Sequence, residues 1–219
     1  MDTLWNFEKM DSWTKSSTCC LPHMNVRRLL KKWIWDTFVF PSFFHPTAQF
    51  RPRGSGAGNG FYKLGFYKND GSWFSFEQLR GKKVIIINTA SACGYTHQYA
   101  DWEQFYSQNS KEFEILAFPS NQFLGQERGT DQEIANFCNL HFNLHFPLFK
   151  KSDVRGKTKN EVYSWLSSKP LNGWNDRSPA WNFNKYVVDQ DGELRAFFPS
   201  KTSPKDDDFI QLIQNMNQD

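Results

Sequence analysis

Apolar residues gather along this chain in runs that predict a layered α/β fold. Val84–Ile87 and Phe113–Phe118 are short and almost entirely apolar, as expected for strands that are buried on both faces. Residues 95–110 lie between these runs and place Tyr99 and Trp102 on one side of a helix. A strand, a helix and a second strand in this order predict two parallel strands joined by a crossover helix.

Turn and capping residues predict the remaining elements. Asn69-Asp70-Gly71 separates two short apolar runs and predicts a hairpin, and Thr130-Asp131-Gln132-Glu133 is a capping box that opens a helix through about His141. The elements expected after this helix are a short helix at Val162–Leu166, a hairpin made of Trp181–Val188 and Glu193–Phe198, and a last helix opened by Ser203–Asp206. This order describes a thioredoxin-like α/β domain, with a central mixed sheet flanked by helices.

The first sixty residues differ from the rest and predict an irregular N-terminal extension. Residues 24–40 carry apolar side chains at helical spacing, with lysines and arginines on the other face. Such a basic amphipathic helix suits a membrane interface, here through residues 25–38, but packing on the folded body or disorder would explain it equally well. Residues 41–60 are rich in glycine and proline and predict a flexible linker, so we place the domain boundary at 60/61.

Charge and cysteine content narrow the possible functions. The formal net charge is +3, and the basic excess lies in residues 24–63, so the body gives little support for nucleic-acid binding. No apolar run is long enough to span a bilayer. The four cysteines form no CxxC pair and no zinc-ligand spacing, which predicts no metal or cofactor and favours a reducing, cytoplasmic location. They are Cys19, Cys20, Cys93 and Cys138.

Cys93 lies in the turn between the first buried strand and the helix that follows it. A thiol near a helix N-terminus ionises more readily, and the thiolate is the reactive form. Thr96 stands where a dithiol motif would carry its second cysteine, so the pattern predicts a single-cysteine nucleophile. The alternative is that Cys93 is a small buried apolar residue.

Loops at the carboxyl ends of neighbouring parallel strands meet, and ligands bind there. Gln122 follows the second buried strand, so we expect it close to Cys93, with Trp181 and Asn182 approaching from the side. Taken one at a time, Gln122 and Trp181 are explained as well by surface polarity and core packing.

Three segments resemble the signature segments of glutathione peroxidases: Ala90–Thr96, Phe118–Phe123 and Trp181–Tyr186. The resemblance covers residues 61 to 219 and implies a thioredoxin-like peroxidase domain. It also implies a catalytic tetrad, which by motif is Cys93, Gln122, Trp181 and Asn182. The three neutral N–H donors of such a tetrad lower the pKa of the thiol and so favour the thiolate. They also stabilise negative charge on the oxygen that leaves the peroxide. The product at the cysteine is a sulfenic acid.

Cys138 resembles the resolving cysteine of the thioredoxin-dependent, cysteine-type branch of this family. That role implies attack on the sulfenic acid, an intramolecular disulfide with Cys93, and reduction by thioredoxin. The alternative is a core thiol, because Cys138 falls four residues after Ile134 on an apolar stripe. Two cysteines join only when their Cα atoms are within about 7 Å, so we expect the 131–141 helix to unwind partly.

Departures from the family pattern refine the expected function. Ser120 stands where the family's second motif usually has a cysteine, which leaves Cys138 as the sole candidate for a resolving thiol in the body. The insertion that tetrameric members use for assembly is missing, which predicts a monomer with an open site for hydrogen peroxide and bulky organic or lipid hydroperoxides. No glutathione-binding pattern is present, so thioredoxin and glutathione both stay open as reductants. We therefore expect a thiol peroxidase. The alternatives are a redox sensor that passes its disulfide to partner proteins, and a non-catalytic body tethered to a membrane.

Overall fold

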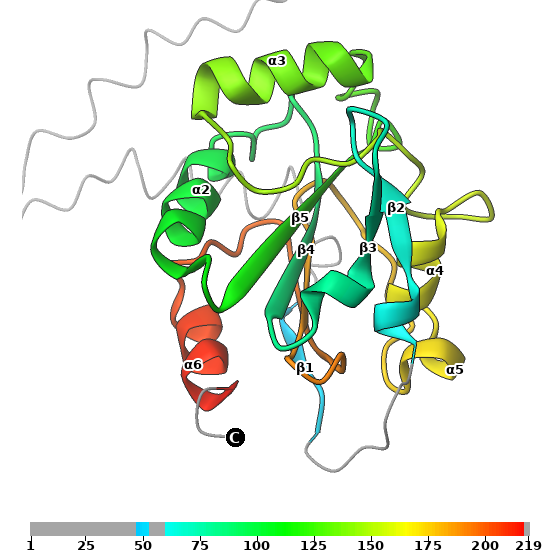
Figure 1. Cartoon of the computed structure of the whole chain (residues 1–219), viewed down its shortest axis with the longest axis vertical. Helices are drawn as coiled ribbons and strands as arrows, with labels where there is room; N and C mark the ends of the chain where they lie inside the picture. The colour runs from blue at the N-terminus through cyan, green and yellow to red at the C-terminus, as the bar shows by residue number, and fades with distance from the viewer. Residues whose placement is uncertain (1–46, 53–59, 217–219) are drawn as a thin grey trace, which may run out of the picture. The chain divides into compact units, whose positions relative to one another are not determined.

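The computed structural model describes residues 47–52 and 60–216, which are arranged as Figure 1 shows. The predicted amphipathic helix at 24–40, with Cys19, Cys20 and most of the predicted linker, lies outside these residues and stays a prediction. Within the described ranges, no helix is both long and apolar enough to cross a bilayer.

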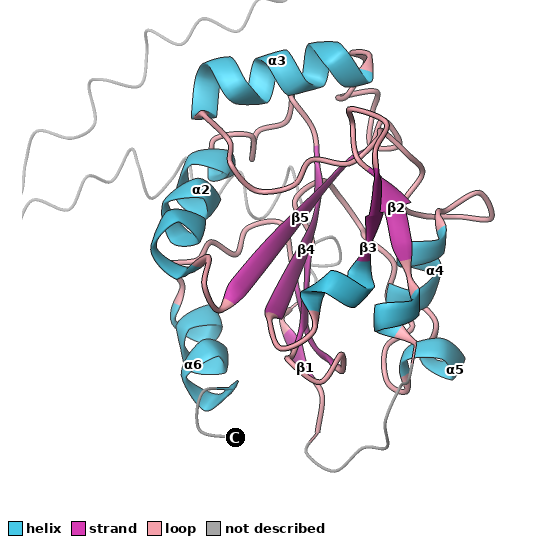
Figure 2. Ribbon diagram, in the orientation of Figure 1, coloured by secondary structure: helices cyan, strands magenta, loops and turns pink. Residues whose placement is uncertain are grey.

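A five-stranded mixed sheet with the strand order β1-β7-β6-β4-β5 forms the centre of the fold. Figure 2 shows its neighbouring strands β4 and β5 with helices beside them. β4 (Lys83–Thr89) and β5 (Phe113–Pro119) are parallel, with Ile85 opposite Ile115, as the strand–helix–strand pattern predicts. β6 (Lys185–Val188) runs antiparallel to β4 and forms the predicted hairpin with β7 (Leu194–Phe198).

Each face of the sheet packs against its own hydrophobic core. Ile85 and Ile87 face a core that contains side chains of α2 (Gln98–Asn109), α3 (Asp131–Phe142) and α6 (Asp207–Met216). Val84 and Ile86 face a second core. Its side of the sheet carries η4 (Phe61–Lys63), the predicted hairpin of β2 (Gly65–Tyr67) and β3 (Trp73–Ser75), η5 (Phe76–Leu79), α4 (Glu161–Leu166) and, after α4, α5 (Lys169–Asn172). Because β4 is buried on both sides, its sequence is continuously apolar rather than alternating.

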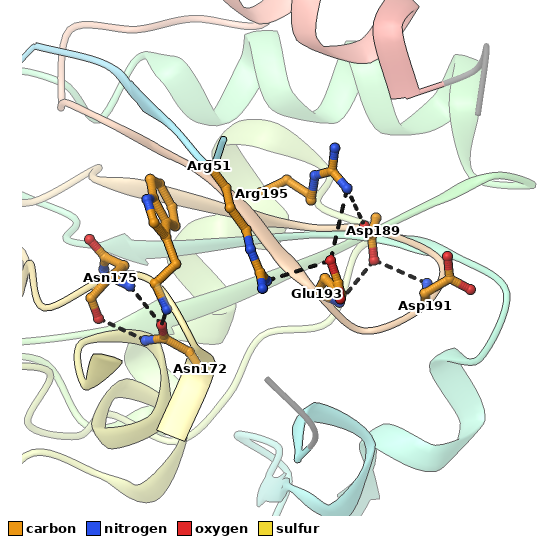
Figure 3. Close-up of polar contacts among 8 residues, drawn as sticks. Arg51, Asn172, Asn175, Asp189, Asp191, Glu193 and Arg195 are labelled. Carbon is orange, nitrogen blue, oxygen red and sulfur yellow. Dashed lines mark hydrogen bonds and ion pairs between the residues drawn. The ribbon is translucent and has the colours of Figure 1, made fainter. Parts of the chain in front are cut away.

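β1 (Gln49–Phe50) corrects the predicted linker at one place. It pairs antiparallel with β7, and the next residue, Arg51, donates its backbone N–H to the carbonyl oxygen of Arg195 at 2.8 Å. The Arg51 guanidinium lies 3.5 Å from the Glu193 carboxylate, and Arg195 lies 3.2 Å from Asp189 (Figure 3). The sheet therefore includes residues that precede Phe61, where we expected the folded part to begin.

Two helix starts differ from those expected. The last helix begins at Asp207, because Ser203 donates its N–H and its hydroxyl group to the Asp206 carboxylate, at 3.2 and 3.3 Å, in a turn before the helix. The first crossover helix begins at Gln98, after a series of turns that start at Cys93. The capping box of α3 forms as predicted, with both Thr130 and Glu133 in place.

Candidate active site

Cys93 lies in the loop that follows the carboxyl end of β4, and its side chain is only 8% exposed. Its backbone N–H donates to the hydroxyl oxygen of Thr96 at 3.0 Å, and this hydroxyl donates to the carbonyl oxygen of Ala90 at 2.8 Å. Thr96 thus closes the turn at the position where a dithiol motif would carry a second cysteine. The backbone N–H of Tyr95 donates to the Cys93 sulfur at 3.5 Å. The donor at the sulfur is therefore a loop amide, whereas the sequence led us to expect the N-terminus of the helix.

Asn182 and Gln126 form a hydrogen-bonded pair beside this loop. Asn182 is 0% exposed, and its Nδ2 donates to Oε1 of Gln126 at 2.9 Å. The carbonyl oxygen of Gln126 accepts the N–H of Ala92 at 3.1 Å, which connects the pair to the residue before Cys93. Gln126 Nε2 has no hydrogen-bond partner among residues 47–52 and 60–216, so this donor is available to a ligand.

Gln122, the glutamine that we expected beside Cys93, has other partners. Its Oε1 accepts the backbone N–H groups of Val154 and Arg155 at 2.8 and 2.9 Å, and its Nε2 donates to the Arg155 carbonyl oxygen at 3.0 Å. These bonds use the side-chain amide to hold the 154–155 loop. The glutamine that the structure brings to Asn182 is therefore Gln126, which corrects the expected place of Gln122.

The backbone of the loop after β5 explains how Gln126 reaches this position. Leu124 and Gly125 both have positive φ angles, 53° and 64°, and they reverse the direction of the chain. The side-chain oxygen of Asn121 accepts the N–H of Glu127 at 3.0 Å and closes the loop. A left-handed leucine is rare, so Gly125 is the one residue of this turn whose type indicates a reversal.

Trp181 is held by a network of two buried asparagines. Asn88 donates from Nδ2 to the carbonyl oxygen of Trp181 at 2.9 Å, and Asn184 Oδ1 accepts the Trp181 N–H at 3.2 Å. The Trp181 ring packs on Phe123, with ring centroids 5.9 Å apart, and borders the core that contains Cys93. Phe183 has a φ of 61°, a conformation that residues other than glycine adopt mainly where the surroundings enforce it.

The described hydrogen bonds do not join Cys93 directly to Gln122, Trp181 or Asn182. Asn182 Oδ1 is buried and has no hydrogen-bond partner within the described ranges. The site thus holds donors and an acceptor that a bound peroxide could use.

Glu127 places a buried carboxyl group next to the Cys93 loop. Its carboxylate accepts the backbone N–H of Ser91 at 2.8 Å and the Ser91 hydroxyl at 3.2 Å. Burial raises the pKa of Glu127, and the two hydrogen bonds from Ser91 oppose this shift. Glu127 therefore anchors the loop two residues before Cys93.

Cys138 lies on α3, is 1% exposed and belongs to the same core as Cys93. Burial raises its pKa to about 11; the nearby Glu127 carboxylate adds to this shift and the Tyr99 hydroxyl opposes it. Cys93 and Cys138 are both free thiols in this structure. A buried neutral thiol is a poor nucleophile, so Cys138 needs a change of surroundings before it can react.

Comparison with known proteins agrees with this geometry. Residues 61–167 match the family model described as glutathione peroxidase. The chain is also 43% identical over 145 residues to the glutathione peroxidase-like peroxiredoxin HYR1 of Saccharomyces cerevisiae, covering 66% of this chain and 89% of that protein. The chain belongs to the glutathione peroxidase family.

Two further proteins are similar to this chain over most of their length. Glutathione peroxidase-like peroxiredoxin 2 of Saccharomyces cerevisiae is 41% identical over 157 residues, which cover 71% of this chain and 96% of that protein. The crystal structure of Trgpx in apo form superposes with a TM-score of 0.56 at 28% identity, over 74% of this chain and 98% of that one. The predicted thioredoxin-like, mixed-sheet fold of this glutathione peroxidase family member is confirmed.

Proposed function

We propose that the chain is a thiol peroxidase in which Cys93 reduces hydrogen peroxide and organic hydroperoxides. The observation that carries the proposal is the position of the Cys93 thiol. It is nearly buried and hydrogen-bonded by a loop amide, and its loop is hydrogen-bonded through Ala92 to Gln126 of the Gln126–Asn182 pair. The names of the related peroxiredoxins support the same activity.

The proposed first step is attack of the Cys93 thiolate on one oxygen of the peroxide. A sulfur–oxygen bond forms, the oxygen–oxygen bond breaks, and the second oxygen leaves with the electron pair and takes up a proton. The product is a sulfenic acid at Cys93 together with water or an alcohol. Neutral N–H donors of Gln126, Asn182 and Trp181 would stabilise the negative charge on the leaving oxygen. Because these donors carry no charge, they would not bind the product as an ion pair.

The proposed second step uses Cys138 as the resolving thiol. Its thiolate attacks the sulfenic sulfur, hydroxide leaves and combines with the proton from Cys138, and a disulfide remains. Thioredoxin is the reductant that we favour, because the related yeast proteins are named peroxiredoxins. The buried position of Cys138 supports a partial opening of α3 during this step.

Steady-state peroxide turnover by three proteins tests the function. With thioredoxin as reductant, we expect wild type to cycle, Cys93→Ser to be inactive, and Cys138→Ser to complete one rapid turnover and then stop. The same assay with glutathione identifies the reductant. A Cys93 thiol that survives mild peroxide treatment would contradict the peroxidase proposal, and stoichiometric transfer of the disulfide to a client protein without turnover would favour a redox relay.

We further propose that the enzyme is a cytoplasmic monomer and that residues 25–38 contact membranes peripherally. The basic amphipathic pattern of this segment supports the contact. Sedimentation of the full chain with vesicles of anionic lipid tests it. The contact is excluded if binding is absent, or if it does not weaken when the salt concentration rises.

A further inference from the structure

Arg155 lies on a loop that Gln122 fixes next to the loop after β5. The Gln122 side chain accepts the backbone N–H of Arg155 at 2.9 Å and donates to its carbonyl oxygen at 3.0 Å. One side-chain amide therefore uses both polar groups of the Arg155 backbone. Gln122 belongs to the same loop as Gln126, so the position of Arg155 is tied to the loop that places the donor beside Asn182.

A row of three packed side chains connects Arg155 with the site. The guanidinium carbon of Arg155 lies 5.5 Å from the centroid of the Phe123 ring, and this ring lies 5.9 Å from that of Trp181. Trp181 packs against the core that contains Cys93. A guanidinium group above an aromatic face is attracted to the ring and still presents its N–H groups at its edge. The row therefore places a positive charge at the rim of the site.

Arg155 forms no ion pair with any carboxylate of the described residues. It is exposed, as is Lys157 on the same loop. The acid nearest to it in the sequence, Asp153, accepts a hydrogen bond from the Thr158 hydroxyl group instead. The planar fork of N–H donors on a guanidinium group matches the oxygens of a carboxylate or a phosphate. Arg155 thus presents a binding group for an oxyanion.

The surface that follows Phe123 in the chain is apolar. Leu124 is 78% exposed and has a left-handed backbone with a φ of 53°, and Trp181 is only partly buried. Exposed apolar side chains next to a cation provide contacts for a hydrocarbon chain and for a negative headgroup. Hydrogen peroxide can use neither contact. The rim therefore matches a hydroperoxide that carries both a hydrocarbon chain and a negative charge.

We propose that Arg155 is a specificity-determining residue that binds the oxyanion headgroup of amphipathic hydroperoxides. The headgroup is the carboxylate of a fatty-acid hydroperoxide or the phosphate of a lysophospholipid hydroperoxide. The inference rests on the proposed function, because it names a substrate class for the Cys93 site. A headgroup bound at Arg155 directs the hydrocarbon chain toward Trp181 and the Cys93 loop. Arg155 takes no part in the bond changes, so the reduction of hydrogen peroxide does not depend on it.

The first test measures the rate of Cys93 oxidation by stopped flow in a Cys138→Ser background, with pairs of substrates that differ in charge. Linoleic acid hydroperoxide and its methyl ester test for a carboxylate. Lysophosphatidic acid hydroperoxide and the monoacylglycerol hydroperoxide test for a phosphate. We expect the charged member of at least one pair to react about fivefold faster, the strength of an exposed ion pair, and the preference to fall as the salt concentration rises.

Two substitutions on the same loop show whether Arg155 causes the preference. Arg155→Met should remove it and leave the rate with hydrogen peroxide unchanged. Lys157→Met is the matched control, because it removes an exposed positive charge from the same loop. The control should keep the preference.

The second test needs no peroxide. Isothermal titration calorimetry measures binding of the unreactive analogues of the preferred pair, which are linoleic acid with its methyl ester, or lysophosphatidic acid with the monoacylglycerol. We expect Arg155→Met to weaken binding of the charged analogue about fivefold and to leave binding of the uncharged one unchanged.

Equal rates for the charged and uncharged members of both pairs would overturn the proposal. An equal loss of preference in Arg155→Met and Lys157→Met would also overturn it, because the whole loop would then attract anions without a site at Arg155. So would an Arg155→Met variant that loses the same factor with hydrogen peroxide. Failure of the peroxidase function has a different signature: the charged analogue would bind in a way that depends on Arg155, but no hydroperoxide would oxidise Cys93.

Discussion

Two glutamines, four residues apart on the loop after β5, make different contacts, and substitution of each separates their roles. Gln126 accepts a hydrogen bond from Asn182 and keeps a free N–H group, whereas Gln122 binds the backbone of the 154–155 loop. We expect Gln126→Ala to slow the reaction of Cys93 with peroxide by tenfold or more, on the order of the loss found when one preorganised donor is removed. Gln122→Ala should change this rate by less than about threefold.

Stopped-flow fluorescence in a Cys138→Ser background measures this first step alone, and Gln126→Glu serves as a size-matched second variant. If the Gln122 substitution slows the reaction more than the Gln126 substitution does, then Gln122, the glutamine that the sequence motif indicated, is the catalytic one.

The raised pKa of Cys138 predicts a loss of stability at alkaline pH. The pKa of the thiol is 9.0 in the unfolded chain and about 11 in the folded protein, so the folded state keeps its proton to higher pH. The stabilising contribution is complete below pH 9 and is lost as the pH rises through the folded pKa. Over this interval, the reduced wild type should lose about 2 to 3 kcal/mol of unfolding free energy that Cys138→Ser does not lose.

Urea unfolding of both proteins under reducing conditions gives this difference directly. Parallel pH profiles for the two proteins would mean that Cys138 titrates normally and that its burial is relieved in solution.

At the site, the residues that sequence reasoning placed well are those fixed by regular structure. Cys93 follows a buried strand and Asn182 precedes one, so their positions follow from the pattern of strands. The position of Gln126 depends on two consecutive residues with left-handed backbone conformations, Leu124 and Gly125. A leucine rarely adopts this conformation, so the sequence does not predict it. The partner of a loop side chain is set by backbone reversals that apolar periodicity does not encode.

Among the elements, α3 carries the clearest consequence for the catalytic cycle. Its capping box holds the N-terminal turn, and Cys138 lies on its buried face. We expect Thr130→Ala to weaken the start of the helix by about 1 kcal/mol. If opening of α3 limits disulfide formation, the rate of formation after a single peroxide pulse should rise about fivefold.

Thr130→Ser is the control, because serine keeps the capping oxygen. Hydrogen exchange of α3 in the reduced and disulfide forms provides an independent measurement. Equal protection in the two forms, or an unchanged rate in Thr130→Ala, would show that resolution proceeds without unwinding.

Most elements were predictable because their signals are local. The capping box of α3, the Asn69–Gly71 turn between β2 and β3, and the apolar runs of β4 and β5 each appear within a few residues of sequence. β1 was not predictable, since two residues carry no periodicity and their pairing is with β7, about 150 positions along the chain.

For the molecule as a whole, stability should depend on residues before the family domain. A chain that begins at residue 61 lacks β1, the backbone bond from Arg51 to Arg195 and the ion pair with Glu193. We expect it to be less stable than a chain that begins at residue 47 by about 2 kcal/mol, the sum of a few net hydrogen bonds. Thermal unfolding of the two truncated chains measures the difference.

Arg51→Met in the longer chain separates the ion pair from the strand itself, and should account for only part of the loss. Equal stability of the two truncated chains would mean that β1 contributes nothing to the fold in solution.

The pairing of β1 with β7 also bears on self-association. An uncovered outer strand presents a row of free N–H and C=O groups to which another polypeptide can add. With β1 in place, the backbone of β7 beside Ala196 and Phe197 is already occupied. A strand of two residues that precedes residue 61 thereby protects this edge of the sheet from pairing with a second chain.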